Sequence, residues 1–304
     1  MKKETEKLFN KMHQYLEDID FEGDEDNAIS EFIEKYNAGE LSEYDNSNEA
    51  KSDEYLQRAY DSIDPEEKKR LAKKALKLNP QNLDAETLVA ITESMPLKIY
   101  RKLETIRKKE EERLRKEGYF DDDSIGIFWG MIETRPYMRL LSHNITTLKE
   151  LGRITEAIKE CERVLELNEN DNMGVRYDLI GMYCLLEKFD DAEKLFEKYN
   201  EDSVYMLFPL AIAQYKAAEY EKSRKTIRKV HAVNKFIADT LAFDLAIDGF
   251  EQEPDYEGYM EGCVRIGHFE EAESVIAMNE LLLSSAYSFP DFYLETLQKV
   301  GAKK

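Results

Sequence analysis

Four stretches of the sequence share one pattern: Gly152-Arg-Ile154-Thr-Glu-Ala157, Glu187-Lys-Phe189-Asp-Asp-Ala192, Ala218-Glu-Tyr220-Glu-Lys-Ser223 and Gly267-His-Phe269-Glu-Glu-Ala272. In each stretch an apolar residue stands three positions before a small one, and an amphipathic segment lies on either side. The small residue lets two helices approach closely, and the apolar residue packs beneath the turn. Apolar positions continue along the second helix, as at Cys161 and Val164. The pattern therefore predicts repeated helical hairpins.

The spacing of the small residues relates these hairpins to a known repeat. The separations are 35, 31 and 49 residues, and the first two bracket the period of about 34 residues of the tetratricopeptide repeat. The segment from Ala75 to Pro80 also resembles the second half of such a repeat. This resemblance implies an all-α solenoid of antiparallel helix pairs. Within the longer gap we expect an inserted helix near 236–250, buried on both faces.

A narrower resemblance rests on three motifs: Trp129-Gly130, Glu133-Thr-Arg135-Pro136-Tyr137-Met138-Arg139, and Leu167-Asn168-Glu-Asn170-Asp171-Asn172-Met-Gly174-Val-Arg176. They resemble tetratricopeptide-repeat proteins related to the suppression-of-tumorigenicity-7 group, which includes bacterial members of no assigned activity. The resemblance implies no chemistry. It supports the fold and leaves the function open.

Composition and turn residues divide the chain further. Low Pro and Gly contents favour helices over a turn-rich β-sandwich. Asp64-Pro65 predicts a helix start, and Asn79-Pro80 predicts a helix end. We expect five regions: acidic N-terminal helices at 1–48, repeat-like hairpins at 49–117, a linker at 118–134, a solenoid at 135–283, and a C-terminal capping helix at 284–304.

Charge weighs against nucleic acid as a partner. The 304 residues include 43 Lys and Arg against 64 Asp and Glu, a net charge of −21, whereas duplex binding depends on neutralising phosphates. Nine basic residues lie between Lys98 and Lys116, but four glutamates are interleaved with them. Three i,i+4 ion pairs are expected on that helix: Glu104/Lys108, Glu111/Arg115 and Glu112/Lys116. The acidic excess favours a basic protein partner.

The compartment expected from the sequence is the cytoplasm. The N-terminus lacks the apolar region of a secretory signal, and no apolar run reaches the roughly 18 residues of a membrane span. We therefore expect no membrane partner. Cys161, Cys184 and Cys263 are widely spaced and odd in number, which favours buried free thiols.

Two arginine motifs are candidate binding residues. Pro136 fits the first turn of a helix that Thr134 would cap, and this helix places Arg135 and Arg139 on one face, with His143 beside them. Arg176 follows the turn Asn170-Asp171-Asn172. If adjacent first helices stack, Arg139 and Arg176 lie close together. They either pair with Glu133, Asp171 or Asp178 to lock two repeats, or bind a carboxylate or phosphate.

The first helices of a tetratricopeptide array line its concave groove. The aligned repeats place aromatic and small residues there, namely Tyr177, Gly181, Cys184, Tyr205, Phe208, Ile212 and Tyr215. This set does not match the two-carboxylate clamp of chaperone-binding repeats. It suits a helix or an extended peptide with apolar anchors. The alternative is that Tyr205, Phe208 and Tyr215 pack against neighbouring helices.

The sequence predicts a binding protein rather than an enzyme. No phosphate-binding loop, HExxH or GxSxG motif occurs, and Asp121-Asp122-Asp123 does not fit a calcium loop. Trp129 is interpreted as a packing anchor. We predict a non-enzymatic scaffold that binds a peptide or helix segment in the groove, with no cofactor or metal. The alternatives are a ligand-responsive regulator that senses a peptide or anion near Arg139 and Arg176, and an enzyme with an unrecognised site between Trp129 and Arg139.

Overall fold

A computed structural model describes residues 6, 8–9, 11–12, 15–16, 25–41, 47–244 and 264–301. Within them the fold is all-α, as predicted, and the only pairing of the β type is an isolated bridge between Ile127 and Asn168. The helices are α2 (Glu25–Ala38), α4 (Asn48–Asp61), α5 (Pro65–Leu78), α6 (Leu83–Ile91), α7 (Pro96–Lys116), α8 (Arg135–Glu150), α9 (Ile154–Leu167), α10 (Val175–Leu185), α11 (Phe189–Tyr199), α12 (Val204–Lys216), α13 (Tyr220–Val233), α14 (Phe236–Asp244), α15 (Phe269–Met278), α16 (Glu280–Ser285) and α17 (Phe289–Gly301). No helix among the described residues is both long and apolar enough to cross a membrane.

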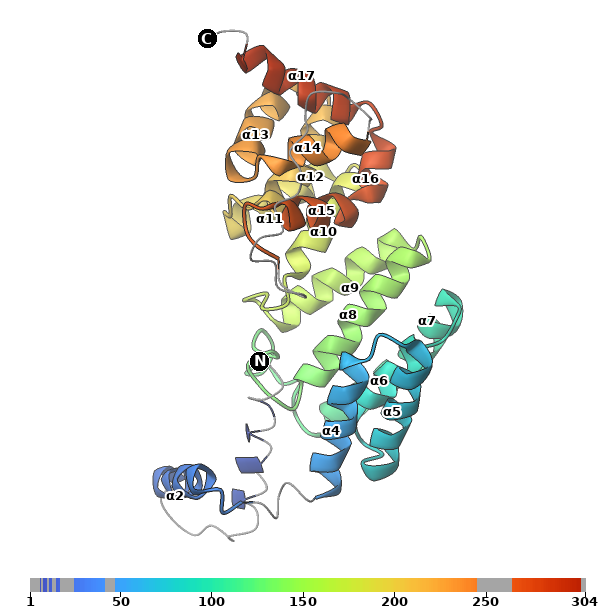
Figure 1. Ribbon diagram of the computed structural model, residues 1–304, viewed down its shortest axis with the longest axis vertical. Coiled ribbons are helices and arrows are strands. Elements are labelled where there is room, and N and C mark those ends of the chain that lie inside the picture. Colours follow the sequence, from blue (N-terminus) through green and yellow to red (C-terminus); the bar gives the residue numbers. More distant parts are fainter. Residues whose placement is uncertain are drawn as a thin grey trace. The chain divides into compact units, whose positions relative to one another are not determined.

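The chain divides into two compact units. Unit 1 comprises residues 1–160 and 166–170, and unit 2 comprises residues 161–165 and 171–304. Helix α8 and the first half of α9 therefore group with the preceding helices. The labels in Figure 1 locate the helices of each unit.

The first hairpins of unit 1 form around the expected turn residues. The Asp64 carboxylate accepts a hydrogen bond from the Glu66 amide at 3.1 Å, and Pro65 occupies the first turn of α5. Asn79 ends α5, as its sequence position predicts. The buried faces of α4, α5 and α6 meet in one apolar cluster, which includes Leu56, Ala59, Leu71, Ala72, Ala75, Ala85 and Leu88.

The N-terminal residues that are described also bury an apolar stripe. Leu8, Met12 and Leu16 pack against a cluster that contains Tyr15, Phe32 and Leu41. The rings of Tyr15 and Phe32 are 5.7 Å apart. Residues 17–24 and 42–46 of the expected N-terminal region 1–48 lie outside the described residues.

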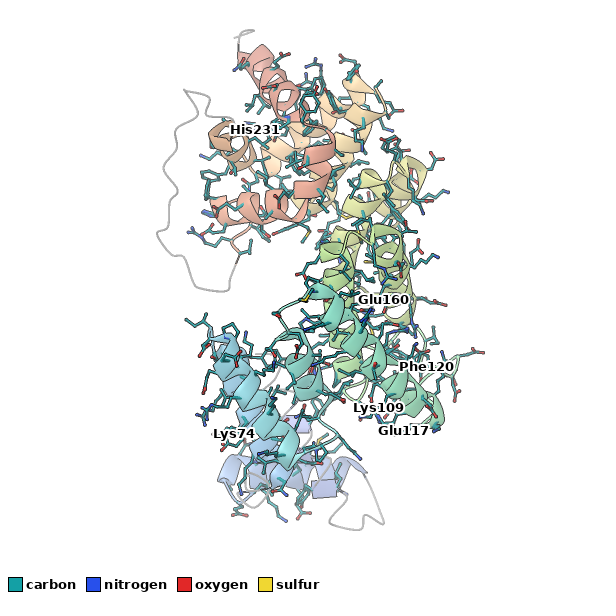
Figure 2. The ribbon with its side chains drawn as sticks, turned by 90° about the vertical axis from the view of Figure 1, so that its right-hand side faces the viewer. Lys74, Lys109, Glu117, Phe120, Glu160 and His231 are labelled. Atoms are coloured by element: carbon teal, nitrogen blue, oxygen red, sulfur yellow. The ribbon has the colours of Figure 1, made fainter. Side chains whose placement is uncertain are left out.

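The segment 118–134, expected as a linker, is packed into unit 1 through Phe128. Phe128 is fully buried, and its ring centroid lies 5.1 Å from that of Phe120 and 6.4 Å from that of Tyr137. Figure 2 shows Glu117 and Phe120 just beyond the end of α7. Trp129 is partly buried and packs beside Arg135. The fully buried ring of this segment is that of the neighbouring Phe128.

Two of the three ion pairs predicted on α7 are present. Glu111 bonds to Arg115 and Glu112 bonds to Lys116, at 2.8 and 2.7 Å. Glu104 instead bonds to Arg107 at 2.8 Å, three residues along the helix. Helix α8 packs on α7, and Asn144 of α8 donates a further hydrogen bond to Glu104.

The four repeated stretches adopt the same turn. Gly152, Glu187, Ala218 and Gly267 stand first in their stretches, and all have left-handed backbones, with φ of 70°, 58°, 61° and 77°. The small residues five positions later, Ala157, Ala192, Ser223 and Ala272, are all fully buried. In the first three turns the next residue donates its amide to a carbonyl five positions back, as in Arg153 to Leu148 at 2.9 Å. This is the Schellman ending of a helix, so the first three hairpins close by one mechanism.

The left-handed turn residues lead to paired predictions of stability. Gly152→Ala is expected to lower the free energy of unfolding by about 1 kcal/mol, because a Cβ disfavours this backbone. No heavy atom lies within 4 Å of that Cβ, so the cost is conformational. Ala218→Gly should raise the free energy of unfolding by up to about 1 kcal/mol. Urea unfolding measures both changes.

A neighbouring alanine supplies the matched control. Ala217 has an ordinary φ of −74°, so Ala217→Gly should lower stability by roughly 0.5–1 kcal/mol because glycine only adds freedom to the unfolded chain. If Ala217→Gly and Ala218→Gly change stability in the same direction, the left-handed conformation at Ala218 is not the source of strain.

Unit 2 continues the hairpins with α10–α11 and α12–α13, followed by α14. Helix α14 begins at Phe236 and buries Ile237, Ala238 and Leu241, which confirms a buried helix over the first part of 236–250. The remainder of that expected helix, and Cys263, lie outside the described residues. Cys161 and Cys184 are buried, and burial raises the pKa of the Cys184 thiol to about 12.

Helices α15, α16 and α17 pack back onto the hairpins of unit 2. Helix α16 contacts α10 and α12, α15 contacts α12 and α14, and α17 contacts α13 and α14. Figure 1 shows these C-terminal helices, in red, gathered around α12, α13 and α14. This packing determines which parts of the expected groove remain accessible.

Candidate functional site

The arginine face of α8 is neutralised within unit 1. Arg139 donates from Nε and Nη2 to the two carboxylate oxygens of Asp84, at 2.8 and 2.6 Å, and from Nη1 to Glu6 at 3.0 Å. The one-turn spacing of α8 brings Arg135 to the same Glu6 carboxylate at 3.5 Å. Arg135 also donates to the Trp129 carbonyl and lies 5.8 Å from the indole ring. These guanidinium groups hold carboxylates of their own chain.

The N-terminus of α8 differs from the sequence prediction at Thr134. This residue precedes the helix, but its hydroxyl makes no capping bond and instead donates to the carbonyls of Phe128 and Met131. Pro136 lies in the first turn, as expected. The hydroxyl therefore ties the 118–134 segment to the start of α8.

Burial and charge act together on the titratable groups near Arg139. Burial alone would lower the pKa of Arg139, but its hydrogen bonds to Asp84 and the charges of Asp84 and Glu6 raise it above its ordinary value. Burial lowers the pKa of His143, and the charges of Asp84 and Arg139 oppose one another there. Burial also raises the pKa of Tyr60 beside Asp84. His143 is therefore neutral at pH 7, and Arg139 remains a cation.

Arg176 lies in unit 2, in a second network of carboxylates. It donates to Asp171 at 2.8 Å and to Glu201 at 2.8 and 3.0 Å, and it also donates to the Tyr177 hydroxyl. That hydroxyl in turn donates to Glu201 at 2.7 Å. The guanidinium carbon lies 4.1 Å from the Tyr177 ring centroid and 5.2 Å from that of Tyr199. The guanidinium is thus held on its faces and its edges.

Asp171 organises the turn before α10. It has a left-handed backbone with φ of 43° and is 3% exposed. Its carboxylate accepts from the amides of Val175 and Arg176 at 2.7 and 3.0 Å, in addition to the Arg176 side chain. Because unmatched helix-start amides need an acceptor, Asp171 fixes both the helix start and the arginine.

Tyr177 and Glu201 take opposite pKa shifts within this network. Burial and the hydrogen bond to Glu201 raise the pKa of Tyr177 to about 12. Burial opposes the shift at Glu201, but hydrogen bonds from Tyr177, Ser203 and Arg176 hold the pKa of its carboxyl below the ordinary value. The network is therefore a neutral tyrosine, one cation and two carboxylates at pH 7.

The two arginine clusters match the structural interpretation rather than the ligand-binding one. Arg176 pairs with Asp171, as that interpretation predicts, whereas Arg139 pairs with Asp84 and Glu6 rather than with Glu133 or Asp178. Arg139 and Arg176 belong to different units, and carboxylates of the same unit bind each of them. Each guanidinium is thus neutralised within its own unit.

The predicted groove residues divide into an accessible part and a covered part. Tyr177 and Tyr205 are partly exposed, and their ring centroids are 5.1 Å apart. Phe208, on the same face of α12, is fully buried against Phe289 and Tyr293 of α17. The prediction that Phe208 is open to a ligand was therefore wrong, because α17 occupies that position.

Tyr215 and Gly181 are also covered by the C-terminal helices. The Tyr215 hydroxyl bonds to Ser288 at 2.8 Å, and its ring contacts Phe289 and Phe292. At Gly181 a Cβ would lie 2.8 Å from the Asn279 side-chain oxygen. Lys216 reinforces this cover by donating to the Leu185 carbonyl and to Ser285. The expected groove is thus filled by the chain along most of α12.

Several residues of these clusters were not found from the sequence. Asp84 and Glu6 lie 55 and 133 positions from Arg139, and no local pattern connects them. Glu201 likewise stands in the loop after α11. The apolar positions of α17 did carry a signal, since Phe289, Phe292, Tyr293 and Thr296 follow the i, i+3, i+4, i+7 spacing of a helix face.

Comparison with known proteins gives no family assignment. No protein-family model matches the chain, and no curated protein matches it significantly. Among the described residues, no group of three or more His, Cys, Asp or Glu side chains could hold a metal ion.

Proposed function

We propose that this chain is a non-enzymatic protein-interaction scaffold of the tetratricopeptide-repeat class. The observation that carries the proposal is the recurrence of one hairpin turn, with a left-handed first residue and a buried small residue, at four places in the sequence. Stacked hairpins present an extended surface without needing a catalytic pocket. Such surfaces bind peptides and helices through apolar anchors.

The partly exposed aromatic pair of Tyr177 and Tyr205 is the proposed entry to the groove. Their rings come from the first turns of α10 and α12 and lie side by side. Arg176 and Glu201 hold the Tyr177 hydroxyl in place, so the pair is preorganised. Aromatic side chains that are rigid and half-buried are typical binding anchors. We propose a protein or peptide partner in the cytoplasm.

The alternative of a regulator that senses an anion has no observation in its favour. The N–H groups of Arg139 and Arg176 already donate to Asp84, Glu6, Asp171 and Glu201. A free anion would have to displace these carboxylates. We therefore advance the scaffold alone.

Selection from a displayed library of random 16-residue peptides tests the scaffold proposal. We expect the full chain to enrich peptides with apolar anchors, and Tyr205→Ala to weaken their binding about tenfold, as for a typical interface anchor. Tyr119→Ala, at a half-buried tyrosine of unit 1, is the matched control and should leave binding unchanged. Fluorescence anisotropy measures the affinities.

The same selection can contradict the proposal. If the chain enriches no peptide beyond those enriched in a parallel selection on an unrelated helical protein, the groove is not a peptide-binding surface. If enriched peptides bind Tyr205→Ala and the parent chain equally, the site lies elsewhere on the molecule.

A further inference from the structure

Helix α17 has the form of a bound helical ligand. Its residues Phe289, Phe292, Tyr293 and Thr296 occur at positions i, i+3, i+4 and i+7. Phe289, Tyr293 and Thr296 are fully buried, whereas Asp291 and Glu295, which lie between them in sequence, are exposed. This spacing is the one with which amphipathic helices enter apolar grooves.

The surface that receives α17 comes from α12, α13 and α14, and its aromatic part comes from α12 and α13. The Phe292 ring centroid lies 4.8 Å from that of Tyr215 and 5.8 Å from that of Tyr220. Phe289 contacts both Phe208 and Tyr215, at 6.1 and 5.6 Å. We call the four residues Phe208, Tyr215, Tyr220 and Arg224 the receiving surface.

Arg224 gives this surface a polar end. Its guanidinium carbon lies 4.3 Å from the Phe292 ring centroid, and its Nη1 donates to the Thr296 hydroxyl at 2.9 Å. Tyr215 makes the corresponding hydrogen bond to Ser288 before the start of α17. Two hydrogen bonds at opposite ends therefore fix the register of the helix.

The packing of α17 is not fully satisfied. The Tyr293 hydroxyl is buried without a hydrogen-bond partner among the described residues. An unpaired buried hydroxyl lowers the stability of the packed helix, and a helix without that hydroxyl would not have this penalty. The segment that joins α16 to α17 is short and carries Tyr287 at 86% exposure. These features distinguish α17 from an optimised core helix.

Charge indicates what kind of helix the receiving surface prefers. Helix α13 carries Lys222, Arg224, Lys225, Arg228 and Lys229 against a single acidic residue, Glu221. Lys222 pairs with Glu193 and Glu219, Arg224 with Glu221, and Lys229 with Asp202. Lys225 and Arg228 are exposed and have no ion-pair partner among the described residues. In a chain of net charge −21, this helix is locally basic. It therefore favours an acidic helix, in contrast to the basic partner suggested by the net charge.

We propose that the receiving surface binds an acidic amphipathic helix of a partner protein, with aromatic residues at i, i+3 and i+4 and a hydroxyl at i+7, and that α17 occupies it within the free chain. This inference rests on the scaffold function and specifies its partner. The partner helix displaces α17 from α12 and α13. A tethered segment has an effective concentration near the millimolar range. A partner helix must therefore bind the receiving surface tightly enough to compete with α17.

The test uses a fluorescent peptide with the sequence of residues 286–301 and the full-length chain. Phe292→Ala in the chain weakens α17, because Phe292 makes the contacts to Tyr215, Tyr220 and Arg224 while remaining partly exposed. We expect this variant to bind the peptide at least about tenfold more tightly than the parent chain. Circular dichroism verifies that the variant keeps its helices.

Two further arms identify the chemistry of binding. A peptide with Asp291→Lys and Glu295→Lys should bind the Phe292→Ala chain several-fold more weakly, since it opposes the charge of α13. Adding Arg224→Ala to the Phe292→Ala chain should also weaken the binding of the unmodified 286–301 peptide. Should the folded Phe292→Ala chain bind the peptide no better than the parent chain, the inference is wrong.

Other occupants give distinct results. If the Phe292→Ala chain forms a dimer by light scattering and binds no peptide, the surface receives a second copy and not an acidic partner helix. If library-selected peptides bind at Tyr205 while the 286–301 peptide does not bind, the scaffold function stands and this inference fails. If neither class of peptide binds, both fail.

Discussion

The Asp84→Ala variant is expected to lose about 3–5 kcal/mol of the free energy of unfolding of unit 1, because it leaves a buried guanidinium without its main partner. Both oxygens of Asp84 accept from Arg139, and the two side chains are 10% and 19% exposed. The remaining contact to Glu6 involves one N–H group. The loss is therefore that of an uncompensated charge and not of a surface ion pair.

Trp129 makes this measurement specific to unit 1. It is the only tryptophan of the chain and it contacts Arg135, one helical turn from Arg139. Urea unfolding followed by tryptophan fluorescence should show the midpoint of the variant shifted to lower concentration. Glu66→Ala, an exposed acidic residue at the start of α5, is the control and should cost less than about 1 kcal/mol.

A double variant separates the ion pair from the packing around it. Combining Asp84→Leu with Arg139→Met removes both charges, and we expect the double variant to recover most of the stability lost in Asp84→Ala. An Asp84→Ala cost below about 1 kcal/mol would contradict the assignment of this pair as a buried structural element.

The second large effect is expected at Asp171. Asp171→Ala should lower the free energy of unfolding of unit 2 by about 3 kcal/mol or more, since it removes the acceptor for two helix-start amides and a buried partner of Arg176. It also places alanine at a φ of 43°. Asparagine keeps a side-chain acceptor and readily adopts the left-handed backbone. We therefore expect Asp171→Asn to lower the free energy of unfolding by about half as much as Asp171→Ala.

Thermal unfolding followed by far-ultraviolet circular dichroism measures the change at Asp171. The control is Glu197→Ala on the exposed face of α11, which should change stability by less than about 0.5 kcal/mol. Equal losses for Asp171→Ala and Asp171→Asn would show that the charge on Arg176 is the dominant factor and that the helix-start hydrogen bonds contribute little.

The hairpins could be predicted from the sequence because their determinants are local. The small residue, the apolar residue before it and the turn all lie within six positions, and the structure places Ala157, Ala192, Ser223 and Ala272 in equivalent buried sites. The left-handed turns at Glu187 and Ala218 could also have been inferred, because both residues align with glycines in the other two stretches.

The covering of the groove could not be predicted in the same way. Phe208 lies on the face of α12 that the repeat alignment assigns to the groove, and in the structure it is buried against Phe289 and Tyr293 of α17. The spacing of Phe289, Phe292 and Tyr293 predicts an apolar helix face but not the surface that receives it. The partners of Arg139 were inaccessible to local patterns for the same reason, because they come from distant segments.

Hydrogen exchange with a library-selected peptide tests the central claim, that the hairpins of unit 2 form a protein-binding surface which α17 covers in the free chain. The account predicts that saturation with the peptide slows amide exchange in α12 and α13 and accelerates it in α17. Unchanged exchange in all three helices, or slower exchange in α17 together with α12 and α13, would contradict the account.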